Sequence, residues 1–292
     1  MHVALAQLVT GLSIGAVLLL IALGLTFTFG QMGVINMAHG EFIMAGAYTA
    51  YMLQGPLGNQ SLLVALPVAF LVAGAIGLAL ERLLIRRFYG RPLDTLLVTW
   101  GVSLILQQAA RDLFGAPNVE VKGPSWLNGG FHVAGVTIGA SRVFIMGVVA
   151  AAVVAIWLYL TRSPQGRRTR AVVENRQLAA CTGIATTAVD QRTFFIGSGL
   201  AGVAGVGITL LGSVGPTLGS NYLVDAFLVV VVGGLGHLRG AVLAAVGLGL
   251  LRAYVEYFSQ ASFARVVVFI AIVAFLQARP QGLFVLKTRS LQ

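Results

Sequence analysis

Nine long apolar runs dominate this sequence and limit it to a small group of folds. They lie near residues 5–29, 34–54, 61–80, 93–113, 143–160, 193–211, 222–236, 241–257 and 264–277. Roughly 20 helical residues cross the apolar core of a bilayer, which is about 30 Å thick, and most of the runs are close to this length. Only 10% of the residues are charged, against about 25% in soluble domains. The sequence therefore predicts an all-α fold, a polytopic transmembrane helical bundle of eight or nine spans in one domain over residues 1–292.

Basic residues predict how this bundle is oriented. Lys and Arg number 19 and Asp and Glu 9, which gives a net charge of +10, and 13 of the basic residues lie in the segments 82–91, 162–192 and 279–289. An excess of Lys and Arg marks cytoplasmic loops. We therefore expect these segments and the C-terminus in the cytoplasm, with 161–192 as the only long cytoplasmic connection and the loop 114–140 outside. Because membrane orientation accounts for the basic residues, no nucleic-acid partner is expected.

The cytoplasmic connection carries signals for a capped helix. Ser163 followed by Pro164 is typical of an N-cap with proline at the first helical position. Gly183 is typical of a helix stop, so one helix is expected between them. Thr187 with Asp190 three residues later predicts a capping box that opens the next membrane helix. Such a polar helix is either a docking surface for a partner or a solvated connector, and the residue pattern leaves both open.

Two stretches interrupt the apolar pattern, at residues 30–41 and 221–240. Each joins two apolar halves through glycines and carries a histidine and a carboxylate. Transporters often build their site where helices are interrupted at corresponding positions of two repeats. The pattern predicts interrupted helices around a translocation path and raises the hypothesis of an internal inverted repeat.

Six residues in these stretches are candidates for the substrate path: Asn36, His39, Glu41, Asn221, Tyr222 and Asp225. A charge near the bilayer centre costs roughly 2.5–3.5 kcal/mol, so the two carboxylates should face a cavity or a partner. The alternative is that each merely pairs with an arginine at the membrane surface. Asn36 could cap a half-helix that begins at Met37 and leave backbone N–H groups free for a ligand. A lone histidine is more often a hydrogen-bonded packing residue than a proton relay.

The sequence offers little for catalysis or for cofactors. No Gly-x-x-x-x-Gly-Lys-Ser/Thr segment occurs, so ATP would have to bind to other subunits. Cys181 is the only cysteine and has no histidine near it in the sequence, and no group of residues has metal-ligand spacing. We therefore expect a transport protein with no metal site, no cofactor and no enzymatic activity of its own.

Several motifs resemble permeases of the branched-chain amino acid type of ABC importer. One is Gly24-Leu25-Thr26-Phe27-Thr28-Phe29-Gly30, which leads into Ile35-Asn36-Met37-Ala38-His39-Gly40-Glu41. The other looks like the ATPase-coupling segment of that family. It consists of Ser163-Pro164-Gln165-Gly166-Arg167, followed by Arg170-Ala171-Val172-Val173-Glu174-Asn175 and Gly183-Ile184. The resemblance extends along essentially the whole chain and implies coupling residues Arg167, Arg170, Ala171, Glu174, Asn175 and Gly183.

The resemblance also implies a cellular setting. Permeases of this type are multi-pass proteins of the bacterial inner membrane and pair with a homologous second permease. Two ATPase subunits bind the ATP and drive the pair, and an extracytoplasmic solute-binding protein delivers the substrate. The long apolar runs, the missing P-loop and the capped cytoplasmic helix agree with this setting.

Three stretches resemble the urea-transporting branch of the family: Gly215-Pro216-Thr217-Leu218-Gly219, Asn221-Tyr222-Leu223-Val224-Asp225-Ala226-Phe227 and Arg279-Pro280-Gln281-Gly282-Leu283-Phe284. Ser220 stands where that branch would have glutamine, and His237 where asparagine or lysine is commoner. The resemblance implies a path for urea. The alternatives are branched-chain or other amino acids or short amides, and behind them a passive channel for small solutes.

Overall fold

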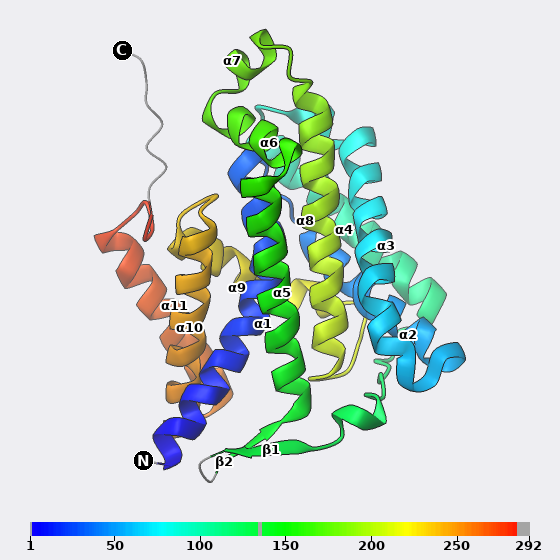
Figure 1. The fold of residues 1–292 in the computed structure, drawn as a ribbon, viewed down its shortest axis with the longest axis vertical. Coiled ribbons are helices and arrows are strands. Elements are labelled where there is room, and N and C mark those ends of the chain that lie inside the picture. Colours follow the sequence, from blue (N-terminus) through cyan, green and yellow to red (C-terminus); the bar gives the residue numbers. More distant parts are fainter. Residues whose placement is uncertain (1, 134–135, 285–292) are drawn as a thin grey trace.

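Helices occupy all of the predicted apolar runs in the computed structural model, which describes residues 2–133 and 136–284 (Figure 1). They are α1 (His2–Met32), α2 (His39–Leu57), α3 (Ser61–Leu83), α4 (Pro92–Phe114), α5 (Ala140–Arg162), α8 (Thr186–Thr209), α9 (Leu218–Gly233), α10 (Leu238–Phe258) and α11 (Ala261–Ala278). The largest differences from the predicted runs are at two helix starts. Helix α2 begins at 39 instead of 34, and α8 begins at 186 instead of 193.

Short elements connect the long helices. Helices α6 (Pro164–Glu174) and α7 (Arg176–Cys181) lie between α5 and α8. Three short 3₁₀ helices are η1 (Gly58–Gln60), η2 (Ile85–Phe88) and η3 (Ser125–Leu127). Strands β1 (Gly130–Val133) and β2 (Val136–Gly139) form an antiparallel hairpin in which Gly130 pairs with Gly139. The fold is therefore almost entirely helical, as predicted.

Five helical stretches among the described residues are long and apolar enough to cross a membrane. One of them, His39–Leu83, contains both α2 and α3, and α9 and most of α11 form shorter apolar helices. These stretches agree with a polytopic transmembrane bundle. The total of eight or nine spans stays a prediction.

Helix α1 lies at the centre of the bundle. It packs against α5, α8, α9 and α10, and the side chains of Leu20, Ile21, Ala22 and Leu23 are almost completely buried. A helix that is apolar on all sides suits a position surrounded by other helices. Glycines on α1, among them Gly11, Gly15 and Gly24, allow the neighbouring helices to approach it closely.

Glycines allow the innermost helices to touch through their backbones. A Cβ atom on Gly24 would lie 2.2 Å from the carbonyl oxygen of Gly197, and one on Gly219 would lie 2.0 Å from that of Gly40. No side chain fits at either position. Helix α1 thus packs directly on α8, and α2 on α9, as small residues permit in membrane bundles.

Helices α1–α3 and α8–α10 form two inverted halves. Helix α3 packs on α8, and α10 takes the equivalent place on α1. Helix α1 runs away from the end that carries the N-terminus, whereas α8 runs back toward it (Figure 1). The break at 33–38 between α1 and α2 corresponds to the break at 210–217 between α8 and α9. The first predicted interruption is therefore confirmed. The second was placed wrongly, because residues 234–237 are the turn between α9 and α10.

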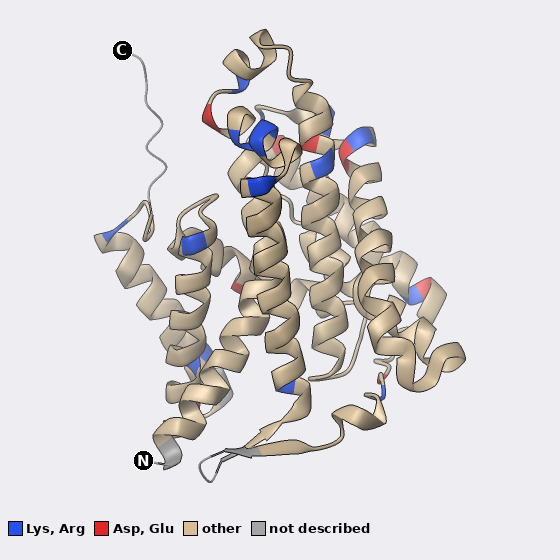
Figure 2. Cartoon of the chain, in the orientation of Figure 1, with Lys and Arg blue, Asp and Glu red and all other residues tan. Residues whose placement is uncertain are grey.

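The two ends of the bundle differ in structure and charge. Helices α6 and α7 project from one end, where Lys, Arg, Asp and Glu gather (Figure 2). The N-terminus and the β1–β2 hairpin lie at the opposite end (Figure 1). Residues 161–192 and 114–140 are thus on opposite ends, as the predicted topology requires. Which end faces the cytoplasm stays a prediction.

Candidate functional site

The break between α1 and α2 is held by hydrogen bonds to its backbone. Asn36 is 1% exposed, and its Oδ1 accepts a hydrogen bond from the Ala38 N–H at 3.0 Å. The Met37 N–H donates to Thr99 Oγ1 of α4 at 3.0 Å. The predicted cap is therefore wrong in detail, because α2 begins at His39 and Asn36 instead closes a turn just before it.

Glu41 is the centre of a buried polar network that joins three helices. Its side chain is 1% exposed, and Oε1 accepts hydrogen bonds from Ser103 Oγ at 2.8 Å and from Gln107 Nε2 at 2.9 Å. Gln107 Nε2 also lies 3.0 Å from Ser220 Oγ on α9. Within the described part of the chain, Glu41 has no ion-pair partner and its Oε2 has no hydrogen-bond partner. Pairing with an arginine at the surface does not apply to this carboxylate.

The partners of Glu41 were not predicted from the sequence, although α4 carries a signal for them. Thr95, Thr99, Ser103 and Gln107 recur every four residues within an apolar run, and all four are buried. Residues four apart lie on one face of a helix. A polar stripe of this kind indicates a helix that faces polar groups inside the bundle rather than lipid.

Asp225, unlike Glu41, lies within ion-pair distance of an arginine. Its Oδ2 lies 3.7 Å from Arg252 Nη1, and Arg252 Nε also donates to Glu256 at 2.8 Å. The three side chains are about a quarter exposed. Asp225 lies two turns into α9 rather than at the helix break, so the structure does not bring it together with Glu41.

The remaining path candidates are scattered. His39 is buried, and its Nε2 lies 3.1 Å from the carbonyl oxygen of Ile21, which makes it a packing residue between α1 and α2. Asn221 is exposed on α9, and Tyr222 is half-buried. Of the six candidates, Asn36, His39 and Glu41 gather at the start of α2.

The capped start of the connection between α5 and α8 is as predicted. The Ser163 side chain accepts a hydrogen bond from the Gly166 N–H at 2.8 Å, and Pro164 is the first residue of α6. The far end also stops at Gly183, whose φ is +84°. Glycine adopts this left-handed conformation without strain, so the helix stop was correctly predicted.

The single helix expected between these ends is wrong. Asn175 is extended, with φ −154° and ψ 104°, and its side chain accepts a hydrogen bond from the Leu178 N–H at 2.9 Å. Asn175 therefore caps a second helix, α7, which turns away from α6. Asparagine is among the best N-cap residues, so this break had a signal in the sequence.

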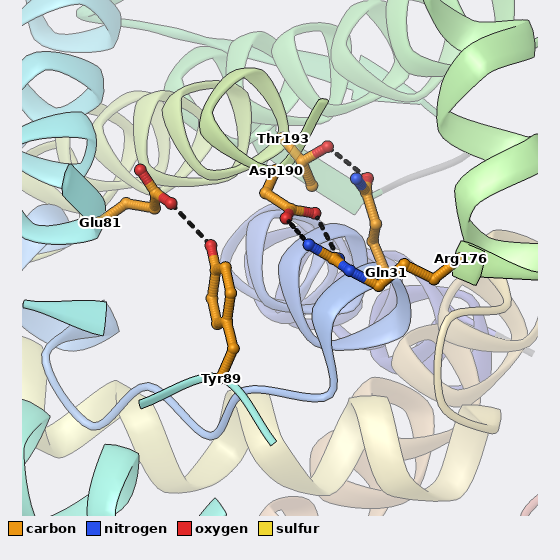
Figure 3. A network of polar contacts seen from close by, with 6 residues as sticks. All are labelled: Gln31, Glu81, Tyr89, Arg176, Asp190 and Thr193. Carbon is orange, nitrogen blue, oxygen red and sulfur yellow. Dashed lines mark hydrogen bonds and ion pairs between the residues drawn. The ribbon is translucent and has the colours of Figure 1, made fainter. Parts of the chain in front are cut away.

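Arg176, the first residue of α7, is bound to the bundle (Figure 3). Its guanidinium donates to both carboxylate oxygens of Asp190 on α8, with Nη1 3.1 Å from Oδ1. Asp190 is completely buried, whereas the Arg176 side chain is 43% exposed. The hydrogen bonds from Arg176 to Asp190 raise the pKa of Arg176 above its usual value. The capping box expected from Thr187 and Asp190 does not form, because α8 begins at Thr186 and Thr187 therefore lies inside the helix.

Further polar contacts lie around this ion pair (Figure 3). The Arg176 guanidinium lies 5.5 Å from the ring centre of Tyr89, in the segment that leads to α4. The Tyr89 hydroxyl donates to Glu81 Oε1 on α3 at 2.7 Å, and burial together with this bond raises the pKa of Tyr89. Thr193 on α8 donates to Gln31 at the end of α1. The α6–α7 segment is thus connected to α8 through Asp190 and to α3 through Tyr89, and a separate hydrogen bond joins α8 to α1.

The residues that the resemblance implies for ATPase coupling lie on this segment. Arg167, Arg170, Glu174 and Asn175 are exposed, Ala171 is half-buried and Gly183 is exposed. Leu178 on α7 is a large apolar side chain that is 62% exposed. Beneath α6, a cavity of about 220 Å³ lies between α1, α5 and the α9–α10 turn, with Arg170 and Glu174 in its wall.

Comparisons with known proteins identify the family of this chain. Residues 7–276 match the family described as branched-chain amino acid transport system / permease component. The chain is 32% identical to the high-affinity branched-chain amino acid transport system permease protein BraD of Pseudomonas aeruginosa, over 96% of this chain and 95% of BraD. It is 31% identical to LivH of Escherichia coli over 96% of this chain and 94% of LivH. It is 27% identical to LivM of Salmonella typhimurium over 91% of this chain and 67% of LivM.

These relatives correct the substrate expectation. BraD, LivH and LivM are named for branched-chain amino acid transport, so the resemblance to the urea-transporting branch has no support from them. They are permease subunits rather than enzymes. The chain belongs to the family of permease components of branched-chain amino acid ABC transport systems.

Proposed function

We propose that this chain is a permease subunit that imports branched-chain or closely related apolar amino acids across the bacterial inner membrane. It acts with a homologous second permease, two ATPase subunits and an extracytoplasmic solute-binding protein. One observation supports this substrate class: the relatives BraD and LivH, which match along nearly their whole length, are named as branched-chain amino acid transport permeases. This proposal replaces the path for urea.

The crossing of α2 and α9 supports a translocation path for an amino acid at that point. Both helices begin inside the bundle, and their first turns meet at Gly40 and Gly219. Helix N-termini favour negative groups such as a carboxylate. The unpartnered Oε2 of Glu41 lies in the first turn of α2 and would suit an ammonium group. In this structure Gln107 bridges Glu41 and Ser220, so passage of a solute requires Gln107 to move.

The α6–α7 segment supports docking of the ATPase. It projects from the bundle and presents Glu174, Asn175 and the apolar Leu178. The Arg176–Asp190 ion pair connects it to α8, so a displacement of α7 would reach the bundle. At the opposite end, the loop 114–140 is the proposed contact for the solute-binding protein.

Reconstitution of the whole importer tests the substrate class. The complex is captured from its native membrane by a tag on this chain, placed in liposomes and supplied with its binding protein. We expect leucine, isoleucine and valine to be taken up and to stimulate ATP hydrolysis, with little response to urea. Uptake of urea in preference to these amino acids, or uptake that needs no ATP, would contradict the proposal.

A bulky substitution tests the docking segment. We expect Glu174→Trp to preserve insertion of the chain and to abolish the link between ATP hydrolysis and uptake. Ala109→Trp, at an exposed position on α4, is the matched control and should remain coupled. If both variants transport normally with the ATPase bound, the dock lies elsewhere.

A further inference from the structure

A groove of about 360 Å³ opens between α3, α5 and α8, next to α6. Two arginines, Arg82 on α3 and Arg192 on α8, lie at its rim. Its floor is apolar and includes Leu78, Phe195 and Ile196. The candidate translocation path lies elsewhere, at the crossing of α2 and α9, so this groove has no place in the proposed transport step.

Among the described residues, the two arginines at the rim form no ion pair. Arg82 Nη2 lies 3.5 Å from Oε1 of Gln191, and Arg192 donates to Oε1 of Gln165 on α6. Arg168 on α6 also donates to Gln165, at 3.5 Å. In the described ranges these three arginines form no ion pair, and the groove is lined by no Asp or Glu. Their partners are neutral amides, so the rim attracts an anion.

Along both helices that line the groove, the arginine lies nearer the end that carries α6 and the apolar residues lie deeper in the bundle. Leu78 precedes Arg82 by four residues on α3, and Ile196 follows Arg192 by four residues on α8. Four residues correspond to about 6 Å along a helix. The two helices run in opposite directions, since α3 ends and α8 begins at the end that carries α6 (Figure 1). Both arginines therefore lie at that end, and the apolar floor lies one turn deeper in the bundle.

We propose that this groove binds an anionic phospholipid, with its phosphate on Arg82 and Arg192 and an acyl chain along the apolar floor. Basic pockets between membrane helices at the cytoplasmic surface are suited to anionic head groups. An acidic protein segment in the cytoplasm could reach the arginines, but it would leave the apolar floor within the bilayer uncovered. The order of charge and apolar surface therefore favours a lipid.

Bound lipid would also influence the α6–α7 segment. Gln165 on α6 holds Arg192 on α8, so a phosphate on Arg192 would lie at the contact between these helices. The site depends on the membrane location of the chain and not on which solute is transported. Its test can therefore fail or succeed independently of the substrate experiment.

Lipid binding to the whole importer tests the site. The importer is placed in nanodiscs of phosphatidylcholine with increasing phosphatidylglycerol, and retained lipids are counted by native mass spectrometry. We expect preferential retention of phosphatidylglycerol, reduced about fivefold by either Arg82→Gln or Arg192→Gln and about 25-fold by both, because each basic residue near an anionic lipid surface contributes a similar factor. Arg87→Gln, exposed on η2 outside the groove, is the matched control and should bind like the unmodified protein.

Two further arms distinguish other occupants. Inorganic phosphate should displace the lipid poorly, and Leu78→Asp should weaken lipid retention, because the acyl chain contributes to binding. Equal retention of the two lipids, equal loss in the Arg87→Gln control, or complete displacement by phosphate overturns the proposal. Lipid that binds the isolated chain but not the importer also overturns the proposal, since a partner subunit would then cover the arginines.

Discussion

Removing either member of the Arg176–Asp190 ion pair should have unequal effects. Arg176→Gln leaves the fully buried Asp190 carboxylate without its cation, whereas Asp190→Asn leaves a guanidinium that is already 43% exposed. Loss of one partner from a buried pair costs about 3–5 kcal/mol because the other charge stays desolvated. The partial exposure of Arg176 places the expected cost of Arg176→Gln near the lower value, about 3 kcal/mol. Asp190→Asn should cost about 1 kcal/mol, as for exposed pairs, because Arg176 can regain water.

Hydrogen exchange of the backbone amides in α7 and the first turns of α8 measures this difference locally. The opening free energy of such a region determines its exchange rate, so about 3 kcal/mol corresponds to roughly a hundredfold faster exchange and about 1 kcal/mol to roughly fivefold. The double variant Arg176→Gln/Asp190→Asn should exchange more slowly than Arg176→Gln alone, because it no longer buries an unpaired charge. Amides at the centre of α1 serve as the internal control.

One result would refute this reasoning. If Asp190→Asn speeds exchange as much as Arg176→Gln, the buried charge is not what makes the pair important. The stability of α7 would then come from the Asn175 cap and the apolar contacts of Val172 and Ala179. In the importer, the variant with faster exchange should also hydrolyse more ATP for each solute taken up.

Three further predictions concern the bundle. Gly219→Ala should prevent assembly because its Cβ would lie 2.0 Å from a carbonyl oxygen of α2, whereas Gly247→Ala on α10, which has open space, should assemble normally as judged by gel filtration. Glu41→Gln should lower uptake more than tenfold, which corresponds to a barrier increase above about 1.4 kcal/mol. Asp225→Asn loses only a partly exposed ion pair and should transport nearly normally. A larger loss of uptake in Asp225→Asn than in Glu41→Gln would contradict the candidate site. Ser125→Cys should react with an impermeant thiol reagent on intact spheroplasts, and the native cysteine on α7 only after permeabilisation; the opposite pattern would invert the topology.

Local signals predicted most of the fold. The positions of the long helices follow from apolar runs of membrane length. The two ends of the connection between α5 and α8 follow from Ser163 and Gly183, whose effects reach only a few residues along the chain. The capping box at Thr187 and Asp190 was wrong because α8 begins at Thr186, which puts Thr187 inside the helix. The partner of Asp190 is Arg176 on α7, which comes within reach only when α7 packs against α8.

The candidate site was only partly predictable. Glu41 was identified because a carboxylate in an apolar run is costly, but its partners Ser103 and Gln107 are 62 and 66 residues away. Asp225 looked equivalent to Glu41 in the sequence, yet Arg252 on another helix neutralises it. Which carboxylate keeps a free oxygen depends on how the helices pack, and packing is not encoded at one position.

A small contact between the loop before the hairpin and the break before α9 has consequences for how this protein can evolve. Val119 in the loop before the hairpin and Val214 in the break before α9 exchange two backbone hydrogen bonds of 2.8 Å. No particular side chain is required for such bonds. If this loop receives the solute-binding protein, as proposed, its exposed surface can diverge to fit a different partner while its backbone link to the start of α9 is retained. Permeases of this kind could exchange delivery partners through surface mutations alone, without rebuilding the path inside the membrane.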